Sequence, residues 1–273
     1  MKWLKSARVI CTAAALVAVC VSSLSCSPGG ISFPDPNLEE AIREAIGKPT
    51  GPILQSDLDD LTNIDYDTNP AFVKDLSGLE HCTNLRQFII LLSELDDLSP
   101  IAGLTNLTDL TLYDCKITDI SALSDLWQLE SLSLSYNWIT DISALSGLYQ
   151  IHGLCISNNN VSDISPLSNL KYVTYLSMGK NDISDISPLS GLKNVEHLEI
   201  YYNEISDISS LSGLTNLEWV NLKYNLITDI KPLVDNPGLS EGDHVYLEGN
   251  PLSDTSINTY IPQLEARGVD VGY

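Results

Sequence analysis

A 22-residue period runs through most of this 273-residue chain and restricts the folds that it can adopt. Each unit opens on an apolar residue, in the order Cys82, Leu104, Leu126, Leu148, Leu170, Leu192 and Leu214. Positions seven and nine are also apolar, from Phe88 and Ile90 to Val220 and Leu222. The twelfth position holds Ser93, Cys115, Asn137, Asn159, Asn181, Asn203 and Asn225, and Asn250 follows in a shortened final unit. Seven units in one register predict an array that stacks along one axis.

The pattern within a unit predicts one short β-strand per turn of the array. Positions seven and nine are two residues apart, so both side chains point inward from a strand. Strands of successive units then pair in parallel, about 4.8 Å apart, and form one continuous sheet. An asparagine at position twelve can bond main-chain groups left unpaired by the turn, which gives a ladder whose weaker members are Ser93 and Cys115. The second half of each unit lacks a helical apolar stripe, so short 3₁₀ or extended turns are expected there.

These landmarks resemble the leucine-rich-repeat family, L-x-x-L-x-L-x-x-N/C-x-L, in its 22-residue, internalin-like bacterial form. The resemblance covers the chain from about residue 31 to its C-terminus. It implies an α/β solenoid, a right-handed superhelix with a parallel β-sheet on its concave side. The convex side would be 3₁₀ or irregular, and both ends would carry helical caps. The resemblance also implies protein–protein interaction, at the level of the fold alone.

The array needs caps because no single unit can bury its own apolar face. Residues 31–81 are expected to form the N-terminal cap, and residues 82–238 the seven repeats. Within the cap, Asp35 and Pro36 are a good start for a helix that Gly47 ends.

The C-terminal cap is expected in residues 239–273. Apolar residues at helical spacing predict a covering helix that Pro262 breaks or restarts and Gly268 ends. Val269 and Val271 are placed to close the edge of the sheet.

The N-terminus has the features of a targeting segment. Residues 1–25 hold three bases and no acid, followed by an apolar stretch, Val9 to Val21, that is short for a bilayer span. The segment resembles a bacterial lipoprotein signal with cleavage before Cys26, a lipid on its sulfur and a linker over 26–30. Ser23 departs from that pattern because an aliphatic residue is usual there, and an ordinary secretory signal is the alternative. Either reading takes the mature protein out of the cytoplasm.

The residues that flank the inward leucines would face solvent on the concave side, where folding does not dictate their identity. Nine of the chain's 19 aromatic residues fall there: Tyr113, Tyr136, Trp138, Tyr175, Tyr201, Tyr202, Trp219, Tyr224 and Tyr246. Tyrosine and tryptophan concentrate in binding interfaces because they offer large area at low entropic cost. With His197 and Glu199 among them, they predict a face for a protein or peptide, and Trp138, Tyr201 and Trp219 are the first candidates. The alternative is that these rings simply favour sheets and pack on neighbouring strands.

A column of aspartates and a few histidine and cysteine residues could suggest metal binding or catalysis, but their spacing does not support either. An aspartate at position sixteen recurs as Asp97, Asp119, Asp141, Asp163, Asp185, Asp207 and Asp229. Calcium could use such a column, but aspartate before Ile-Ser is well suited to accept backbone N–H bonds at the start of a turn. His197 and His244 are expected two strands apart, about 10 Å, too far to share a metal. Cys155 has no recognisable catalytic partner, so neither an enzyme nor a cofactor is predicted.

The net charge of −22 disfavours nucleic acid and anionic lipid as partners and favours basic ones. The prediction is therefore a monomeric, non-enzymatic, extracytoplasmic module that binds a protein or peptide, with contact to a membrane only through a lipid anchor. A structural cell-envelope spacer and a glycan-binding protein are the alternatives.

Overall fold

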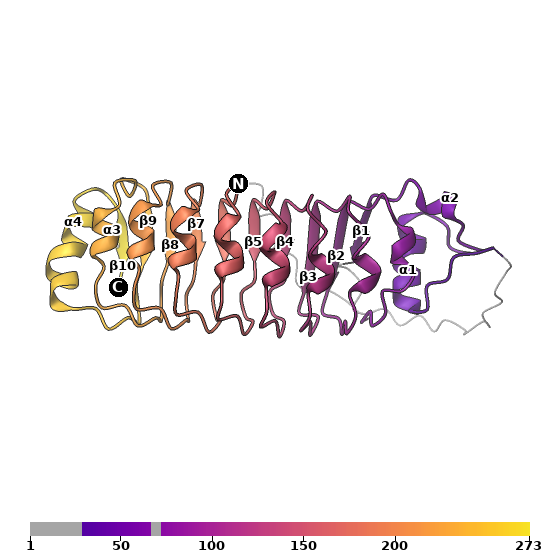
Figure 1. Ribbon diagram of the computed structural model, residues 1–273, viewed down its shortest axis with the longest axis horizontal. Coiled ribbons are helices and arrows are strands. Elements are labelled where there is room, and N and C mark those ends of the chain that lie inside the picture. Colours follow the sequence, from indigo (N-terminus) through magenta and orange to yellow (C-terminus); the bar gives the residue numbers. More distant parts are fainter. Residues whose placement is uncertain (1–28, 67–71) are drawn as a thin grey trace, which may run out of the picture.

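The computed structural model describes residues 29–66 and 72–273, so the signal segment and Cys26 lie outside the described residues. One parallel sheet runs through the whole molecule, and its ten strands follow one another in chain order (Figure 1). The strands are β1 (Asn63–Tyr66), β2 (Gln87–Leu91), β3 (Asp109–Tyr113), β4 (Ser131–Ser133), β5 (Gly153–Cys155), β6 (Tyr175–Ser177), β7 (His197–Glu199), β8 (Trp219–Asn221), β9 (His244–Tyr246) and β10 (Asp270–Gly272). The expected leucine-rich-repeat solenoid is confirmed.

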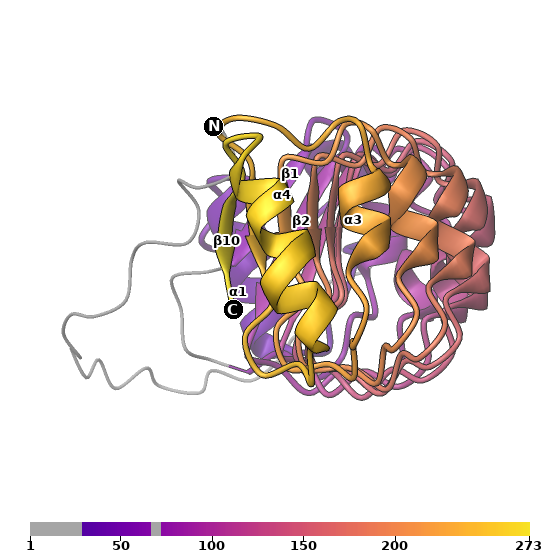
Figure 2. The ribbon, with the colours of Figure 1, turned by 90° about the vertical axis from the view of Figure 1, so that its left-hand side faces the viewer.

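Short helical turns return the chain to the start of each next strand and stack on the side opposite the sheet (Figure 2). The helical elements are α1 (Pro36–Ala45), α2 (Gln55–Leu58), η2 (Leu79–His81), η3 (Ser99–Ile101), η4 (Ser121–Leu123), η5 (Ser143–Gly147), η6 (Ser165–Asn169), η7 (Ser187–Gly191), η8 (Ser209–Gly213), α3 (Lys231–Asp235), η9 (Ser256–Tyr260) and α4 (Ile261–Glu265). Elements η2 to η8 are 3₁₀ helices, as the sequence predicts, whereas the last repeat closes with the one-turn α-helix α3. The apolar landmark residues of every repeat are buried between the two layers and form one continuous core.

The asparagine ladder runs along the core where the strands end. The Oδ1 atom of Asn181 accepts the N–H of Val161 at 2.9 Å, and its Nδ2 donates to the carbonyls of Ile156 and Met178 at 3.0 and 3.1 Å. The same arrangement recurs at the asparagines of the other repeats, and Asn250 ends it. Each amide thus satisfies main-chain groups of its own turn and of the turn before it, so the ladder joins successive repeats.

The aspartate column caps the short helices. In every repeat its Oδ1 atom accepts the N–H of the residue two positions later, at 2.7 or 2.8 Å. These bonds are Asx turns that fix the chain direction just before each 3₁₀ helix. The serine N–H and hydroxyl groups hold the pKa of Asp119, Asp163 and Asp185 below the ordinary value.

The N-terminal cap begins with α1, as the sequence predicts. The Oδ1 atom of the buried Asp35 accepts two first-turn N–H groups of α1, and Gly47 follows the helix with a φ of +64°. The second oxygen of Asp35 accepts the N–H groups of Lys74 and Asp75, at 2.7 and 3.3 Å. One carboxylate therefore caps the helix and joins it to the first turn of the array.

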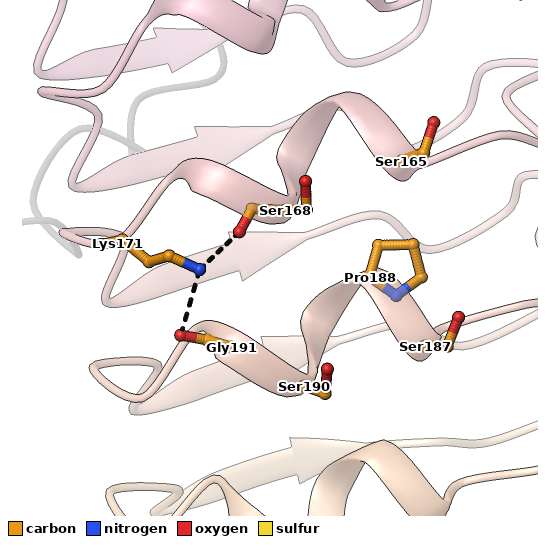
Figure 3. Close-up of a pocket in the computed structure, with 7 residues that line it drawn as sticks. All are labelled: Ser165, Ser168, Lys171, Ser187, Pro188, Ser190 and Gly191. Atoms are coloured by element: carbon orange, nitrogen blue, oxygen red, sulfur yellow. Dashed lines mark hydrogen bonds between the residues drawn. The ribbon is translucent and has the colours of Figure 1, made fainter.

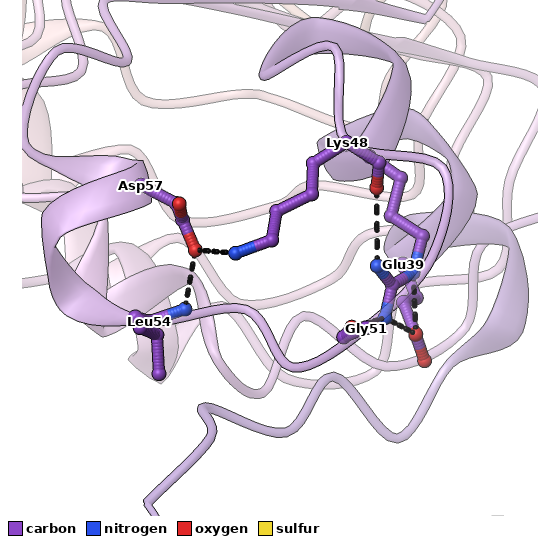
Figure 4. Close-up of polar contacts among 6 residues, drawn as sticks. Glu39, Lys48, Gly51, Leu54 and Asp57 are labelled. Atoms are coloured by element: carbon purple, nitrogen blue, oxygen red, sulfur yellow. Dashed lines mark hydrogen bonds and ion pairs between the residues drawn. The ribbon is translucent and has the colours of Figure 1, made fainter.

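Polar contacts hold the loop between α1 and α2 in place (Figure 4). Arg43 pairs with Glu39 and donates to two loop carbonyls. Lys48 pairs with Asp57 at 2.6 Å, and the same carboxylate oxygen accepts the N–H of Leu54 at 2.7 Å. Lys48 and this N–H group lower the pKa of Asp57.

The cap also supplies the first strand of the sheet, which the sequence pattern did not predict. Strand β1 pairs with β2 in register, and Ile64 lies opposite Phe88. Ile64 is 24 residues before Phe88 rather than 22, and no leucine two positions later marks a strand. The period therefore does not reach β1, although the strand continues the sheet without a break.

The C-terminal cap closes the opposite end. Helical residues run through η9 and α4, and Pro262 lies in the first turn of α4 directly after the wider π turn of η9. The proline therefore restarts the helix rather than ending it. Gly268, with a φ of +88°, follows the helix, and Val271 pairs with Val245 in the last strand pair, as expected.

Candidate functional site

The outward side of the sheet, here called the concave face, carries all nine predicted partner-binding residues. They are Tyr113 on β3, Tyr136 and Trp138 after β4, Tyr175 on β6, His197 and Glu199 on β7, Tyr201 after β7, Trp219 on β8 and Tyr246 on β9. The alternation along each strand buries the landmark residues and leaves these side chains on the opposite side. The repeat therefore places these residues on one face, because side chains alternate between the two sides of each strand.

In each central repeat a left-handed residue lies three positions after the strand and directly before the ladder asparagine. This position has a φ of +61° at Tyr136, +51° at Tyr202 and +55° at Tyr224. The left-handed conformation disfavours a bulky side chain by roughly 1 kcal/mol relative to glycine. The three rings remain 45–47% exposed, although each packs against a neighbouring ring of the face. Folding does not require an aromatic residue at this position, since Asn158 and Lys180 hold it in other repeats, and about half of each ring stays available to a partner.

Other rings of the face also pack against their neighbours. Trp219 lies between His244 and Tyr246, with ring centroids 4.9 Å from each. Tyr113 lies 4.9 Å from Tyr136. Of the three first candidates, Trp138 is 56% exposed, but Trp219 and Tyr201 are half-buried because they lean on adjacent repeats. Trp219 thus contributes to the packing between neighbouring strands as well as to the outer surface of the sheet.

Sequence spacing alone does not rank Tyr202 and Tyr224 above the other aromatic residues. Their rings stack face to face, 4.2 Å apart and 9° from parallel. Lys180 lies over the ring of Tyr202 at 5.9 Å, and Lys223 over that of Tyr246 at 4.7 Å. The period places these residues at position eleven or next to it, but only the backbone angles distinguish position eleven from its neighbours.

Small side chains form the floor of the face between these aromatic groups. They are Ser131, Ser133, Ser135, Gly153, Cys155, Ser157, Ser177 and Gly179. The ring of Tyr201 lies across Gly179, where a Cβ atom would come within 2.5 Å of it. Any larger residue at Gly179 would displace the ring, so the floor and the ring fit each other.

A chain of polar contacts crosses this floor. The hydroxyls of Ser157 and Ser177 are 2.9 Å apart, and Ser177 donates to Glu199 Oε2 at 3.1 Å. Burial raises the pKa of Tyr175 and of Tyr201, and the charge of Glu199 raises both further. The charge of Glu199 therefore acts on both phenols.

Cys155 lies in the same floor as a protonated thiol. Burial, with a further contribution from Glu199, raises its pKa to about 11. We expect alkylation by iodoacetamide to be slow at pH 8 and to rise about tenfold per pH unit until the pH passes 11, because only the thiolate reacts. Mass spectrometry of the peptide that contains Cys155, beside a free cysteine peptide that reaches its plateau near pH 9, measures this. A plateau at the pH of the free peptide would contradict it.

The remaining surface has two features of note. A hollow on the convex side between η6 and η7 is lined by serines, but the Lys171 amine beside it already donates to the Ser168 carbonyl (Figure 3). Three aromatic residues in the loops that precede the strands, Trp127, Tyr149 and Tyr172, are 53–57% exposed. They lie off the concave face and provide a matched comparison for it.

Within residues 29–66 and 72–273, no three histidine, cysteine or acidic side chains are grouped as a metal site. The same residues contain no helix that is both long and apolar enough to cross a bilayer.

Comparison with known proteins agrees with the architecture. The model of the family "Leucine Rich repeats (2 copies)" matches residues 105–147, 127–169, 150–191 and 173–213. Internalin C2 from Listeria monocytogenes is 33% identical with a TM-score of 0.76, over 83% of this chain and all of that one. Internalin InlF of the same species is 29% identical with a TM-score of 0.73, over 92% of this chain and 79% of that one. No curated protein matches this chain in sequence.

A more distant similarity concerns the fold alone. The plant peptide hormone receptor RGFR1, solved in complex with RGF2, is 20% identical with a TM-score of 0.63, over 72% of this chain and 34% of that one. The repeats and the match to internalin C2 define a class, the leucine-rich-repeat proteins. Within that class, the chain belongs to the internalin-like bacterial family.

Proposed function

We propose that this protein is a non-enzymatic recognition module that binds a protein or peptide on its concave face. The observation that carries the proposal is the set of three exposed tyrosines, Tyr136, Tyr202 and Tyr224, on left-handed backbone. A side chain that opposes local folding and remains exposed is typical of a functional surface. Exposed aromatic residues of this kind are enriched among the residues that dominate binding energy.

The setting of the module is part of the proposal. Basic residues, an apolar stretch and Cys26 in the first 26 residues support export, with lipidation of Cys26 as the means of attachment. The partner would then be a macromolecule met outside the cytoplasm. The fold of the RGFR1 receptor, solved with RGF2, is compatible with a peptide in this role.

Replacement of the three tyrosines by asparagine tests the proposal. The chain itself carries Asn158 at the same position with a φ of +57°, so the triple variant Tyr136→Asn/Tyr202→Asn/Tyr224→Asn should fold. We expect the parent protein to retain partners from extracts of its own and neighbouring organisms, and the variant to lose them, at a cost of about 2 kcal/mol or more per dominant residue. Quantitative pull-down with identification of the retained proteins measures this.

A variant with Trp127→Ala, Tyr149→Ala and Tyr172→Ala is the control, because it removes equally exposed rings outside the concave face. Loss of capture by this control and retention by the asparagine variant would place recognition on the loops instead. Competition by soluble sugars would indicate a glycan as the partner.

A further inference from the structure

On the concave face, the half-buried carboxylate of Glu199 is left available to a partner by its surroundings. Glu199 lies on β7, between the aromatic groups. Its Oε2 atom accepts one hydrogen bond, from Ser177, and no lysine, arginine or histidine of the described residues pairs with it. A carboxylate that is half-buried and accepts a single neutral hydrogen bond retains most of its capacity to accept.

The lysines of the face are engaged elsewhere. Lys116 pairs with Glu94, and Lys223 pairs with Glu248 at 2.8 Å. Lys180 lies over Tyr202. No arginine of the described residues lies on the face, since Arg43, Arg86 and Arg267 are in the caps or the loops. The negative charge of Glu199 is therefore not balanced by the chain itself.

The rings around Glu199 suit one kind of cation. Tyr175 on β6 lies opposite His197 on β7, two residues before Glu199, and the ring of Tyr201 lies over Gly179, so aromatic side chains border the strand pair that carries the carboxylate. The face already holds cations over its rings where its own lysines reach them, at Tyr202 and Tyr246. A guanidinium group stacks on aromatic rings and donates two parallel hydrogen bonds to a carboxylate, whereas an ammonium group offers only a point charge.

We propose that Glu199, with Tyr175 and Tyr201 beside it, binds an arginine side chain of the protein or peptide that occupies the concave face. The inference rests on the proposed function, because it names the chemistry of the ligand at that same face. Glu199 lies in register with Ser177 and Cys155 on the two preceding strands, so its neighbours in the sheet on that side are small side chains. The net charge of −22 favours approach of a basic segment.

Selection from a random dodecapeptide library displayed on phage, against the purified protein, tests the inference without knowledge of the natural partner. We expect the selected peptides to contain arginine. Synthetic copies in which citrulline replaces that arginine keep its shape and lose its charge, and should bind at least roughly tenfold more weakly. A copy with lysine at that position should bind with an affinity between those of the arginine and citrulline peptides.

The matching change on the protein is Glu199→Gln, which keeps an acceptor for Ser177 and removes the charge. This variant should lower the affinity for the arginine peptide by a similar factor and leave the affinity for the citrulline peptide unchanged. The control Glu204→Gln removes a charge from an exposed residue of the same repeat and should change the affinity for neither peptide.

The outcomes separate the two proposals. Peptides that need Tyr136, Tyr202 and Tyr224 but contain no arginine, or bind Glu199→Gln as well as the parent, would overturn the inference and leave the proposed function intact. A library that yields no peptide dependent on those tyrosines would count against both.

Discussion

The variant Asn181→Leu is expected to have a free energy of unfolding about 3 kcal/mol below that of the parent protein, because a buried main-chain N–H group loses its acceptor. The carbonyls of Ile156 and Met178 keep a second amide donor, from Asn159 and Asn203. The N–H of Val161 is left without an acceptor, because Asn181 Oδ1 is the atom that accepts it. Leucine also lacks the shape to fill the turn without a shift of the backbone.

Chemical denaturation monitored by circular dichroism measures this loss. The matched control is Asn160→Leu. Asn160 is an exposed residue of the preceding repeat, next to Val161, and its replacement should change stability by less than about 0.5 kcal/mol. Equal stability of the two variants would show that the ladder does not join the repeats as described.

Deletion of residues 148–169 is expected to leave a folded solenoid that has lost at least roughly 100-fold in affinity for any partner of the parent protein. The deleted segment is one full period, so β4 would pair directly with β6 and every landmark residue would keep its register. The same deletion removes the floor residues Cys155 and Ser157. It also brings Tyr136 one strand spacing, about 4.8 Å, closer to Tyr202.

Thermal unfolding and circular dichroism establish whether the shortened chain folds, and titration against the captured partner gives the affinity. A folded deletion variant that binds as tightly as the parent would mean that recognition does not depend on the spacing of the two aromatic groups. An unfolded one would contradict the independence of the repeats that the architecture implies.

The period of the sequence determined most of the fold, because each landmark residue has a defined place in one turn. The ladder of Asn137 to Asn250 and the caps at Asp97 to Asp229 followed from residue chemistry at fixed spacing, and the structure contains both. Strand β1 escaped prediction because Ile64 lies outside the 22-residue period and no leucine follows it two positions later.

The candidate site was predictable as a surface but not as a set of contacts. The alternation of the strands placed the aromatic residues outward, yet nothing in the sequence indicated that Tyr201 would lie over Gly179. Nor could spacing reveal the left-handed backbone at Tyr202 and Tyr224. Such features depend on how neighbouring repeats pack, which local sequence does not encode.

Site-specific photo-crosslinking tests the central claim most directly. Benzoylphenylalanine introduced at Tyr136 lies on the concave face, and the same group introduced at Ser143 lies on η5, on the opposite side. The account predicts that a captured partner crosslinks to the protein substituted at Tyr136 and not to the protein substituted at Ser143. Crosslinking at Ser143 alone would contradict recognition by the concave face.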